Sequence, residues 1–440
     1  MFGEQWYLGY KAGGINPTLA LQFDKQRYAA NGAAKSFSDI LTFTRSTTAT
    51  YFDASGVMQT AAIDAPRFDH DPVTQQPLGI LVEGQRTNAI WNSTNTGVVA
   101  GTIGSGGALP TGWGSSLRGL SLSVETVTVR GVSCLRFRMF GTPSSTGGVN
   151  IPFGAINNAA AVNGQVWTNS VYMALQSGNF NNVTSVRTQF NVFNSSSSYL
   201  QSIASLVSIG GSLTADLQRF TATGTVSNAA AAYIQALFEC GVTSGLPVDF
   251  TIVMGGCQME LGAFASSYIP TTSSAITRAA DLIAATTSNA VPFSSWYNSS
   301  EYTVDVDFIF YGGDAAFPRI VTIGDGNSNV NEASLIQTTS TNQGSFNVYS
   351  SSSFQGMSFG TPDLRGGLKK LAAGFAFNNS AIGYNGAISG TDNSFVLPLS
   401  QNICRIGNSF GLTQAAFLHL REMRFYPKRV SNAELERITT

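Results

Sequence analysis

Three carboxylates share one face of the segment EYTVDVDF, where Glu301, Asp305 and Asp307 occupy odd-numbered positions of an expected strand. Two carboxylates at a suitable separation are the catalytic groups of most glycoside hydrolases. An antiparallel strand with one solvated face presents the same pattern, because its polar residues point to water while Tyr302 and Val304 point inward. We favour the solvated face and keep glycoside hydrolysis as an alternative.

The chain has only two histidines, His70 in FDHDP and His419 in FLHLREM. Nucleophilic catalysis by a Ser-His-Asp triad needs a histidine, and the sequence contains no G-x-S-x-G elbow to accompany one. Flanking Asp69 and Asp71 make His70 part of a polar turn, and His419 lies in an expected strand. The sequence also lacks a P-loop and a dinucleotide fingerprint, so we expect no catalytic histidine and no cofactor.

The four cysteines are far apart in the sequence and form no C-x-x-C pair, which argues against a metal cluster or a redox motif. We expect all four to be buried as small apolar side chains, the usual fate of a free cysteine. A disulfide between Cys240 and Cys257 is conceivable, but the spacing gives no argument for it. The cysteines are Cys134, Cys240, Cys257 and Cys404.

Sugar binding needs aromatic rings that stack on the ring of a sugar, together with amide or carboxylate groups for its hydroxyls. Several aromatic and polar residues lie in turn-like segments such as PTGWGSS and FSSWYN. Trp113 and Trp296 could instead cover the ends of their domains, since tryptophan is heavily buried on average. The turn at Asp325 could hold hydroxyls or calcium, but it has few carboxylates for calcium. The candidates are Trp113, Trp296, Tyr297, Asp325, Asn327, Tyr384 and Asn385.

Three arginines lie close in sequence to acidic residues in a chain that is poor in charge. Arg67 lies near Asp64 and Asp69, Arg86 lies near Glu83, and Arg278 precedes Asp281 by three residues. Charge-assisted hydrogen bonds between such residues would fix the ends of domains. We therefore interpret Arg67, Arg86, Arg278 and Asp281 as structural anchors, with ligand binding as the weaker alternative.

The composition excludes several classes of protein. Charged residues make up 11% of the 440 residues, against about 25% in typical soluble proteins, and the formal net charge is −1. With no block of Lys or Arg, the chain lacks the field of a nucleic-acid binder or of a protein that binds anionic membranes. No apolar run approaches the length of a transmembrane helix.

Apolar and polar residues alternate with a period of two through most of the chain, for example in VDFTIVM and SVRTQFNV. Turn signals such as Asn385-Gly386 separate these runs, a pattern typical of tandem antiparallel β-sandwiches or jelly rolls. The S-x-x-E capping box that begins at Ser431 predicts one short C-terminal helix. The predicted class is all-β, with a turn-rich N-terminal attachment region at 1–95, a jelly roll at 96–270, a linker at 271–289 and a second sandwich at 290–440.

Several motifs together resemble those of phage head-spike and tail-fibre proteins and of the related spikes of gene transfer agents. The most specific run is LTFTRSTTATYFDASGVMQTAAIDAPRFDHDPVTQQPLGILVEGQRTNAIWNS, residues 41–93. The segment GGCQMELGAFASSYIPT resembles the closing strand of a carbohydrate-binding-module-like jelly roll. The last block, from FSSWYNSSEYTVDVDF to LREMRFYPKRVSNAELERI, is similar to laminin-G and concanavalin-A-like sandwiches.

This resemblance implies a virion surface protein, on a phage head or tail, that binds bacterial surface polysaccharide during host adhesion and has no enzymatic activity. It also implies that the N-terminal region binds other virion proteins and that the protein is a homo-oligomer, a trimer or a pentamer, because weak glycan contacts gain from multivalency. A capsid or tail adaptor that binds no sugar, and a capsule-degrading glycosidase, are the alternatives. We expect assembly in the bacterial cytoplasm, since MFGEQWYLGYKAGG lacks the apolar segment of a secretory signal.

Overall fold

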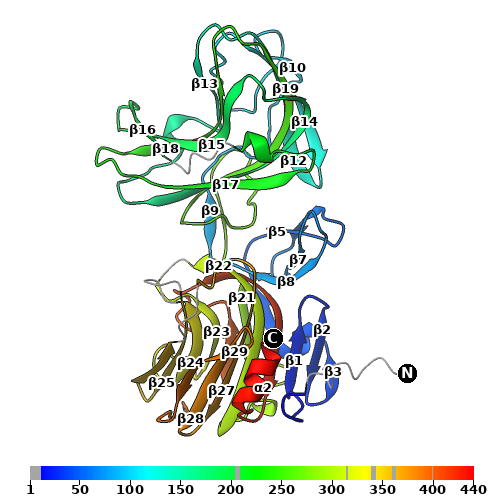
Figure 1. Cartoon of the computed structure of the whole chain (residues 1–440), viewed down its shortest axis with the longest axis vertical. Helices are drawn as coiled ribbons and strands as arrows, with labels where there is room; N and C mark the ends of the chain where they lie inside the picture. Colours follow the sequence, from blue (N-terminus) through cyan, green and yellow to red (C-terminus); the bar gives the residue numbers. More distant parts are fainter. Residues whose placement is uncertain (1–10, 204–208, 314–315, 338–342, 359–362, 399) are drawn as a thin grey trace.

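The computed structural model describes residues 11–203, 209–313, 316–337, 343–358, 363–398 and 400–440. The chain forms two β-rich lobes joined by a narrower waist (Figure 1). The middle of the sequence forms the upper lobe, and the two ends of the sequence together form the lower lobe. The named strands pair with one another in antiparallel fashion in both lobes, so the predicted all-β class with tandem antiparallel sandwiches is confirmed.

Two sheets enclose the core of the lower lobe. The ten-stranded sheet has the order β29 (Ala387–Asp392), β28 (Asn379–Tyr384), β27 (Leu368–Ala376), β22 (Glu301–Gly313), β31 (Ala416–Tyr426), β1 (Leu19–Gln22), β2 (Arg27–Ala30) and β3 (Ala33–Lys35), with β8 (Pro77–Val82) on β31 and β7 (Phe68–His70) on β8. The seven-stranded sheet has the order β26 (Ser353–Ser358), β25 (Gly344–Ser350), β24 (Glu332–Gln337), β23 (Arg319–Gly324), β30 (Ile403–Ile406), β21 (Leu282–Thr286) and β4 (Thr42–Thr44). Their facing apolar side chains form one cluster, which includes Phe308, Ile323 and Phe375.

The N-terminal residues complete the lower lobe, which differs from the separate attachment region that the sequence predicted. Strand β31 pairs with β22 on one edge, and β1 and β8 share its other edge. Without these two strands, the backbone N–H and C=O groups along that edge of β31 would be unpaired. The expected linker 271–289 is also structured, because it contains β21 and the short strand β20 (Ile276–Arg278).

The upper lobe is a sandwich of two sheets formed by one continuous stretch of chain. The six-stranded sheet has the order β10 (Gly101–Thr102), β11 (Ser121–Val129), β12 (Val132–Gly141), β19 (Val248–Leu261), β14 (Val166–Asn179) and β17 (Gln218–Thr225). The four-stranded sheet has the order β13 (Gly147–Pro152), β18 (Tyr233–Val242), β15 (Val183–Phe193) and β16 (Tyr199–Ile203). In VDFTIVM, the alternate residues Val248, Phe250, Ile252 and Met254 are buried in the core, as the period of two predicts.

Two small pairs of strands connect the lobes at the waist. Strand β9 (Arg86–Asn88) pairs with β20, and β5 (Ala49–Phe52) pairs with β6 (Met58–Ala61). The β5–β6 hairpin packs Phe52 against Tyr172 and Val253, which lie on the outer face of the six-stranded sheet. This apolar contact holds the hairpin of the N-terminal region against the upper lobe.

Two short α-helices occur among the described residues. The predicted C-terminal helix is α2 (Asn432–Ile438), where the Ser431 side chain accepts a hydrogen bond from the Glu434 backbone N–H. Helix α1 (Phe37–Ile40) was not predicted, although Ser36 and Asp39 form a complete capping box. Helix α2 covers the outer face of the ten-stranded sheet, where Leu435 packs on Ala372 and Ala381. None of the helices in the described part of the chain is long and apolar enough to cross a membrane.

All four cysteines are buried and free, as predicted. Burial raises the pKa of the Cys134, Cys240 and Cys404 thiols to about 12, so these thiols are neutral at physiological pH. Within the described residues, no group of three His, Cys, Asp or Glu side chains is arranged to hold a metal ion.

Candidate functional site

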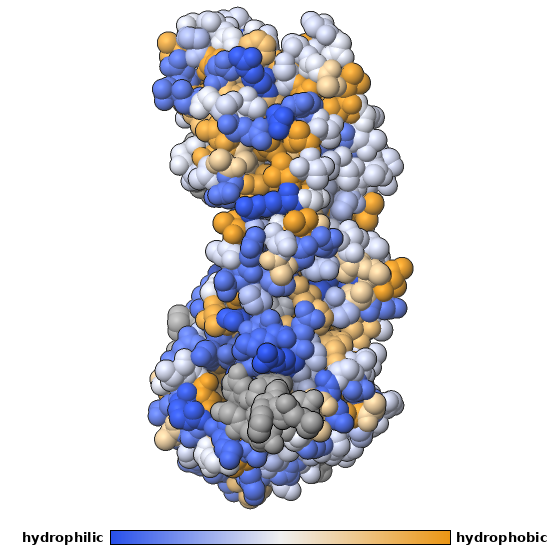
Figure 2. All heavy atoms as spheres, turned by 90° about the vertical axis from the view of Figure 1, so that its right-hand side faces the viewer, coloured by the Kyte–Doolittle hydropathy of each residue, from blue (hydrophilic) through white to orange (hydrophobic). Residues whose placement is uncertain are grey.

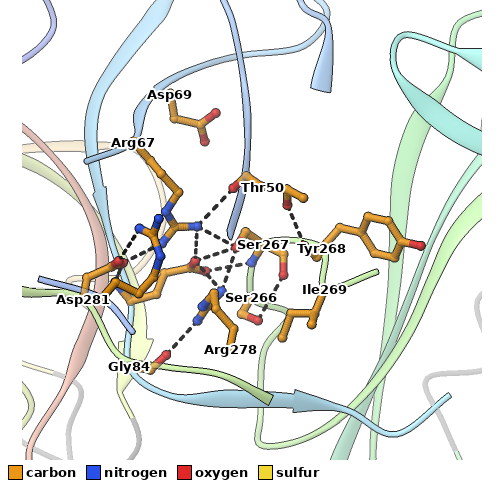
Figure 3. Close-up of polar contacts among 12 residues, drawn as sticks. Thr50, Arg67, Asp69, Gly84, Ser266, Ser267, Tyr268, Ile269, Arg278 and Asp281 are labelled. Atoms are coloured by element: carbon orange, nitrogen blue, oxygen red, sulfur yellow. Dashed lines mark hydrogen bonds and ion pairs between the residues drawn. The ribbon is translucent and has the colours of Figure 1, made fainter. Parts of the chain in front are cut away.

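Five charged side chains form a buried cluster at the waist, which we call the junction cluster (Figure 3). Asp281 lies 3.0 Å from Arg45 and 2.5 Å from Arg67, and Glu83 lies 2.8 Å from Arg67 and 2.6 Å from Arg278. All five side chains are between 0 and 4% exposed. Two carboxylates and three guanidinium groups therefore share a site that water does not reach.

Electrostatics keeps Glu83 and Arg67 of the junction cluster ionised. Burial alone would raise the pKa of Glu83, but Arg278, Arg67 and hydrogen bonds from Ser267 outweigh burial and hold the pKa of this carboxyl well below its usual range. Burial likewise opposes the charge of Arg67, yet Asp281 and Glu83 raise the pKa of its guanidinium above the usual value. Removal of one partner from such a network leaves an uncompensated buried charge, which costs about 3–5 kcal/mol.

The junction cluster also fixes the chain as it leaves the upper lobe. The backbone N–H and the hydroxyl of Ser267 donate hydrogen bonds of 2.7 Å to Glu83, and Arg278 donates to the Gly84 carbonyl at 2.7 Å. The Thr50 hydroxyl donates to the Tyr268 carbonyl, which links the β5–β6 hairpin to the same segment (Figure 3). The arrangement is suited to holding the lobes in one orientation.

The structure brings three of the four expected anchors together, with partners that differ from those nearest in sequence. Arg67, Arg278 and Asp281 belong to the junction cluster, but Arg278 pairs with Glu83 rather than with Asp281. Arg86 lies apart, with its guanidinium carbon 4.9 Å and 4.5 Å from the ring centres of Phe264 and Phe417. Arg45 belongs to the junction cluster and was missed, because its partner Asp281 is 236 residues away in sequence.

A groove of about 260 Å³ lies in the upper lobe, near the segment that follows β9; we call it the Trp91 groove. The Trp91 side chain is 42% exposed, while Trp113 is only 9% exposed and packs on Phe153 with ring centres 4.8 Å apart. The Trp113 indole N–H donates to the Asn92 carbonyl at 3.0 Å, which fixes the position of its ring. The groove is lined by Trp91, Asn92, Thr111, Gly112, Trp113, Phe153, Gly154, Ala155, Asn158, Thr272 and Ser273, and none of these residues is charged.

Most of the sugar-binding residues expected from the sequence do not meet in space. Trp296 is 1% exposed and packs on Phe293 and Phe425 inside the lower lobe, so the prediction of an exposed aromatic platform is wrong there. Trp113 is also mostly buried, although it contributes to the lining of the Trp91 groove. Trp91 was overlooked, although its exposure makes it the better stacking surface.

The remaining candidates lie at separate places of the lower lobe. Tyr297 stacks on Phe293 in the core, and Tyr384 is 8% exposed in β28. Asn385 forms the exposed Asn-Gly turn after β28, where its side chain accepts a hydrogen bond from the Lys370 N–H. Asp325 accepts hydrogen bonds from the Asn327 N–H and the Asn331 amide, so its oxygens stabilise their own turn. These residues do not form one site.

Two of the three carboxylates of β22 are buried, which contradicts the expected solvated face, while Glu301 is half-buried and forms an ion pair with Lys428. Asp305 is 1% exposed and Asp307 is 9% exposed, and Arg424 lies 2.9 Å from Asp305. Burial raises the pKa of Asp305 to about 7 and that of Asp307 to about 6, because Arg424 only partly offsets burial and the negative charge of Glu422 raises both pKa values further. The alternation of the strand is as predicted, but the outer face of the sheet is itself covered.

The two histidines have different surroundings. His70 is half-buried and lies with its Nδ1 3.3 Å from the Phe52 carbonyl. His419 is buried between Asp69, which is 2.9 Å from its Nε2, and the Tyr311 hydroxyl, which is 2.7 Å from its Nδ1. The sequence did not reveal this three-residue chain, because its members come from β7, β31 and β22.

No family model and no curated protein matches the chain. Solved structures do match, among them the CBM40 of a Ruminococcus gnavus IT-sialidase bound to alpha2,3 sialyllactose, at 13% identity over 32% of this chain and 83% of that one, with a TM-score of 0.29. The tripod from the baseplate of bacteriophage Tuc2009 is 14% identical over 82% of this chain and 100% of that one, with a TM-score of 0.29. Mouse laminin alpha1 domains LG4-5 are 11% identical over 66% and 88%, with a TM-score of 0.22. These scores are too low to assign a function.

Proposed function

We propose that this protein is a virion surface spike or fibre protein that binds a bacterial surface polysaccharide during adsorption. The observation that carries this proposal is the Trp91 groove, which combines an exposed indole with amide and hydroxyl groups. An indole offers an apolar face to the C–H groups of a sugar ring, and the side chains of Asn158, Thr272 and Ser273 offer hydrogen bonds to its hydroxyls. The run at residues 41–93 that resembles phage spikes supports the virion location.

The composition and the face of the molecule drawn in Figure 2 suit an adhesin that works outside the cell. Charged residues are few, and Figure 2 presents broad pale areas of intermediate hydropathy between smaller hydrophilic and hydrophobic ones. A homo-oligomer, either a trimer or a pentamer, would multiply weak contacts with a repeating polysaccharide. Attachment to other virion proteins through the N-terminal part of the chain belongs to the same proposal.

A glycosidase that uses the carboxylates of β22 is the weaker candidate. Asp305 forms an ion pair with Arg424 and is 1% exposed, so a polysaccharide could reach it only after the outer face of the sheet opened. Catalytic carboxylates must instead lie on either side of a bound glycosidic bond. We therefore propose a binding protein without enzymatic activity.

The proposal is tested by the affinity of the purified protein for purified polysaccharide of the bacterial host. We expect Trp91→Ala to lower this affinity about tenfold, which corresponds to about 1.4 kcal/mol and to the loss of one aromatic contact. Tyr199→Ala is the matched control, because Tyr199 is an aromatic residue of the same lobe that is 59% exposed and lies outside the groove. Equal affinity of the two variants would refute the groove as the binding site. A wild-type protein that binds no polysaccharide would leave the adaptor as the better description.

A further inference from the structure

A second cavity lies at the waist, with walls that come from both lobes; we call it the interlobe cavity. Its volume is about 200 Å³, below the roughly 300–1,000 Å³ of pockets that hold drug-sized ligands. Tyr172 and Arg219 line it from the upper lobe, and Asp69, Tyr311 and His419 line it from the lower lobe. The size is suited to one small ring rather than to a stretch of polysaccharide.

The two carboxylates that line the interlobe cavity are already satisfied within the protein. Glu83 forms ion pairs with Arg67 and Arg278 and accepts a hydrogen bond from the Ser267 hydroxyl. Asp69 accepts a hydrogen bond of 2.6 Å from the Phe52 N–H, and its other oxygen lies 2.9 Å from His419. Both carboxylates therefore already have partners within the protein and do not need a bound ligand to pair with them.

Arg219 is different, because no carboxylate of a described residue lies within salt-bridge distance of it. Its Nη2 donates to the Ser170 hydroxyl at 2.8 Å, and its guanidinium carbon lies 5.4 Å from the ring centre of Tyr172. Its Nε is buried and has no hydrogen-bond partner in the described part of the chain. Its positive charge thus faces the cavity without an opposite charge beside it.

The remaining lining matches the other parts of a sugar. Phe52, Tyr172, Tyr268 and Phe417 supply aromatic surface. The Tyr311 hydroxyl is held by His419 and keeps acceptor capacity for a ligand hydroxyl. A sugar ring could contact the aromatic side chains with its apolar face, the Tyr311 hydroxyl with one of its own hydroxyls, and Arg219 with one anionic group.

We propose that the interlobe cavity binds the terminal unit of a glycan chain, a pyranose that carries a carboxylate, and that this carboxylate pairs with Arg219. A carboxylate is favoured over a point-like anion because the planar guanidinium presents parallel N–H groups that match its two oxygens. Since both lobes line the cavity, the bound unit would also bridge the lobes. This site is separate from the Trp91 groove and does not depend on sugar binding there.

The test uses two methyl glycosides that differ at one group, methyl β-D-glucuronide and methyl β-D-glucoside, with binding measured by calorimetry on the full chain. We expect the glucuronide to bind at least about tenfold more tightly than the glucoside, since only the glucuronide can pair with Arg219. The glucuronide should also raise the Tm of the protein in proportion to its occupancy. This experiment needs only the wild-type protein. The proposal is overturned if the glucuronide does not bind, or if both glycosides bind with equal affinity.

Variants then locate the site. Arg219→Gln should reduce the affinity for the glucuronide to that for the glucoside, while Arg138→Gln should leave it unchanged. Arg138 is a matched control because it lies in the same lobe, is half exposed and pairs with Asp249 away from the cavity. Trp91→Ala should also leave this affinity unchanged, which separates failure here from failure of the proposed adhesion. Glucuronide binding that survives Arg219→Gln would place the ligand elsewhere and contradict the assignment.

Discussion

The junction cluster and the Trp91 groove use opposite chemistry in one chain. The junction cluster gathers five charged side chains, each at most 4% exposed, in a protein where only 11% of residues are charged. The Trp91 groove has no charged residue in its lining. This difference suggests that strong ionic contacts fix the lobes, while the surface for recognition is left to aromatic, amide and hydroxyl groups.

The largest effect is expected from Asp281→Asn, which would remove one of the two carboxylates that neutralise three buried arginines. We expect the free energy of unfolding to fall by about 3–5 kcal/mol, because a buried guanidinium would lose its partner. Asp249→Asn is the control, since Asp249 and Arg138 are both more than half exposed and such pairs contribute about 0–1 kcal/mol. Urea denaturation measures both variants. Equal losses would show that the junction cluster is no stronger than a surface ion pair.

A pH effect of intermediate size is expected from Asp305. The pKa of this carboxyl is raised to about 7 in the folded protein, so the folded state holds its proton more tightly than the unfolded state. The bound proton therefore stabilises the folded protein fully at pH values below the pKa that Asp305 has in the unfolded chain. This stabilisation is lost as the pH rises through 7. Between pH 5 and pH 8 the free energy of unfolding should fall by about 2 kcal/mol.

Asp305→Asn should reduce this pH dependence without abolishing it, because the amide cannot ionise but Asp307, whose pKa is raised to about 6, still loses its proton in this window. Glu83 does not contribute to the pH dependence in this range. Its pKa is lowered in the folded protein and has its ordinary value in the unfolded chain, so the carboxyl is ionised in both states above pH 5. Urea titrations at each pH give the comparison. A wild-type stability that rises from pH 5 to pH 8 would contradict the assigned direction.

A smaller effect separates recognition from architecture at Trp91. Because Trp91 is 42% exposed and Trp113 is only 9% exposed, Trp91→Ala should lower the free energy of unfolding less than Trp113→Ala does, while it weakens polysaccharide binding. The measurement is urea denaturation of the same preparation that is used for binding. A large loss of stability would mean that Trp91 serves packing, as Trp113 does.

The smallest effect is expected from salt. Because the Trp91 groove has no charged lining, polysaccharide affinity of the Arg219→Gln variant should change less than about twofold between 0.05 M and 0.5 M NaCl. The variant is used so that the interlobe cavity does not contribute. Binding that collapses in high salt would show that charged residues outside the groove dominate recognition.

Local patterns in the sequence were sufficient to predict strands such as β15 and β19 and the last helix, but not β20 and β21 in the expected linker. The period of two placed Phe250 and Ile252 in the core, and the Ser431 capping box placed α2. They could not show that β1 and β8 complete the edge of β31, because residues about 340 to 400 positions apart in sequence pair there. Asp305 was expected in solvent for the same reason, since alternation defines two faces of a strand but not what covers them.

The candidate sites were less predictable than the fold. The charges of Arg278 and Asp281 suggested an anchor, yet their true partners are Glu83, Arg45 and Arg67, which only the three-dimensional arrangement brings near. The Gly and Ser residues around Trp113 favour an exposed turn, although its ring packs on Phe153. Each of these differences arises from contacts between segments far apart in the chain, which spacing along the sequence does not encode.

The most direct test of the central claim is binding of the purified protein to cells of the bacterial host with and without their surface polysaccharide, together with an assay for new reducing ends. We predict binding that depends on the polysaccharide, that is weakened by Trp91→Ala but not by Tyr199→Ala, and that releases no reducing ends. Equal binding to both kinds of cell, or none to either, would contradict the account of this protein as a polysaccharide adhesin. New reducing ends would contradict the claim that it acts by binding alone.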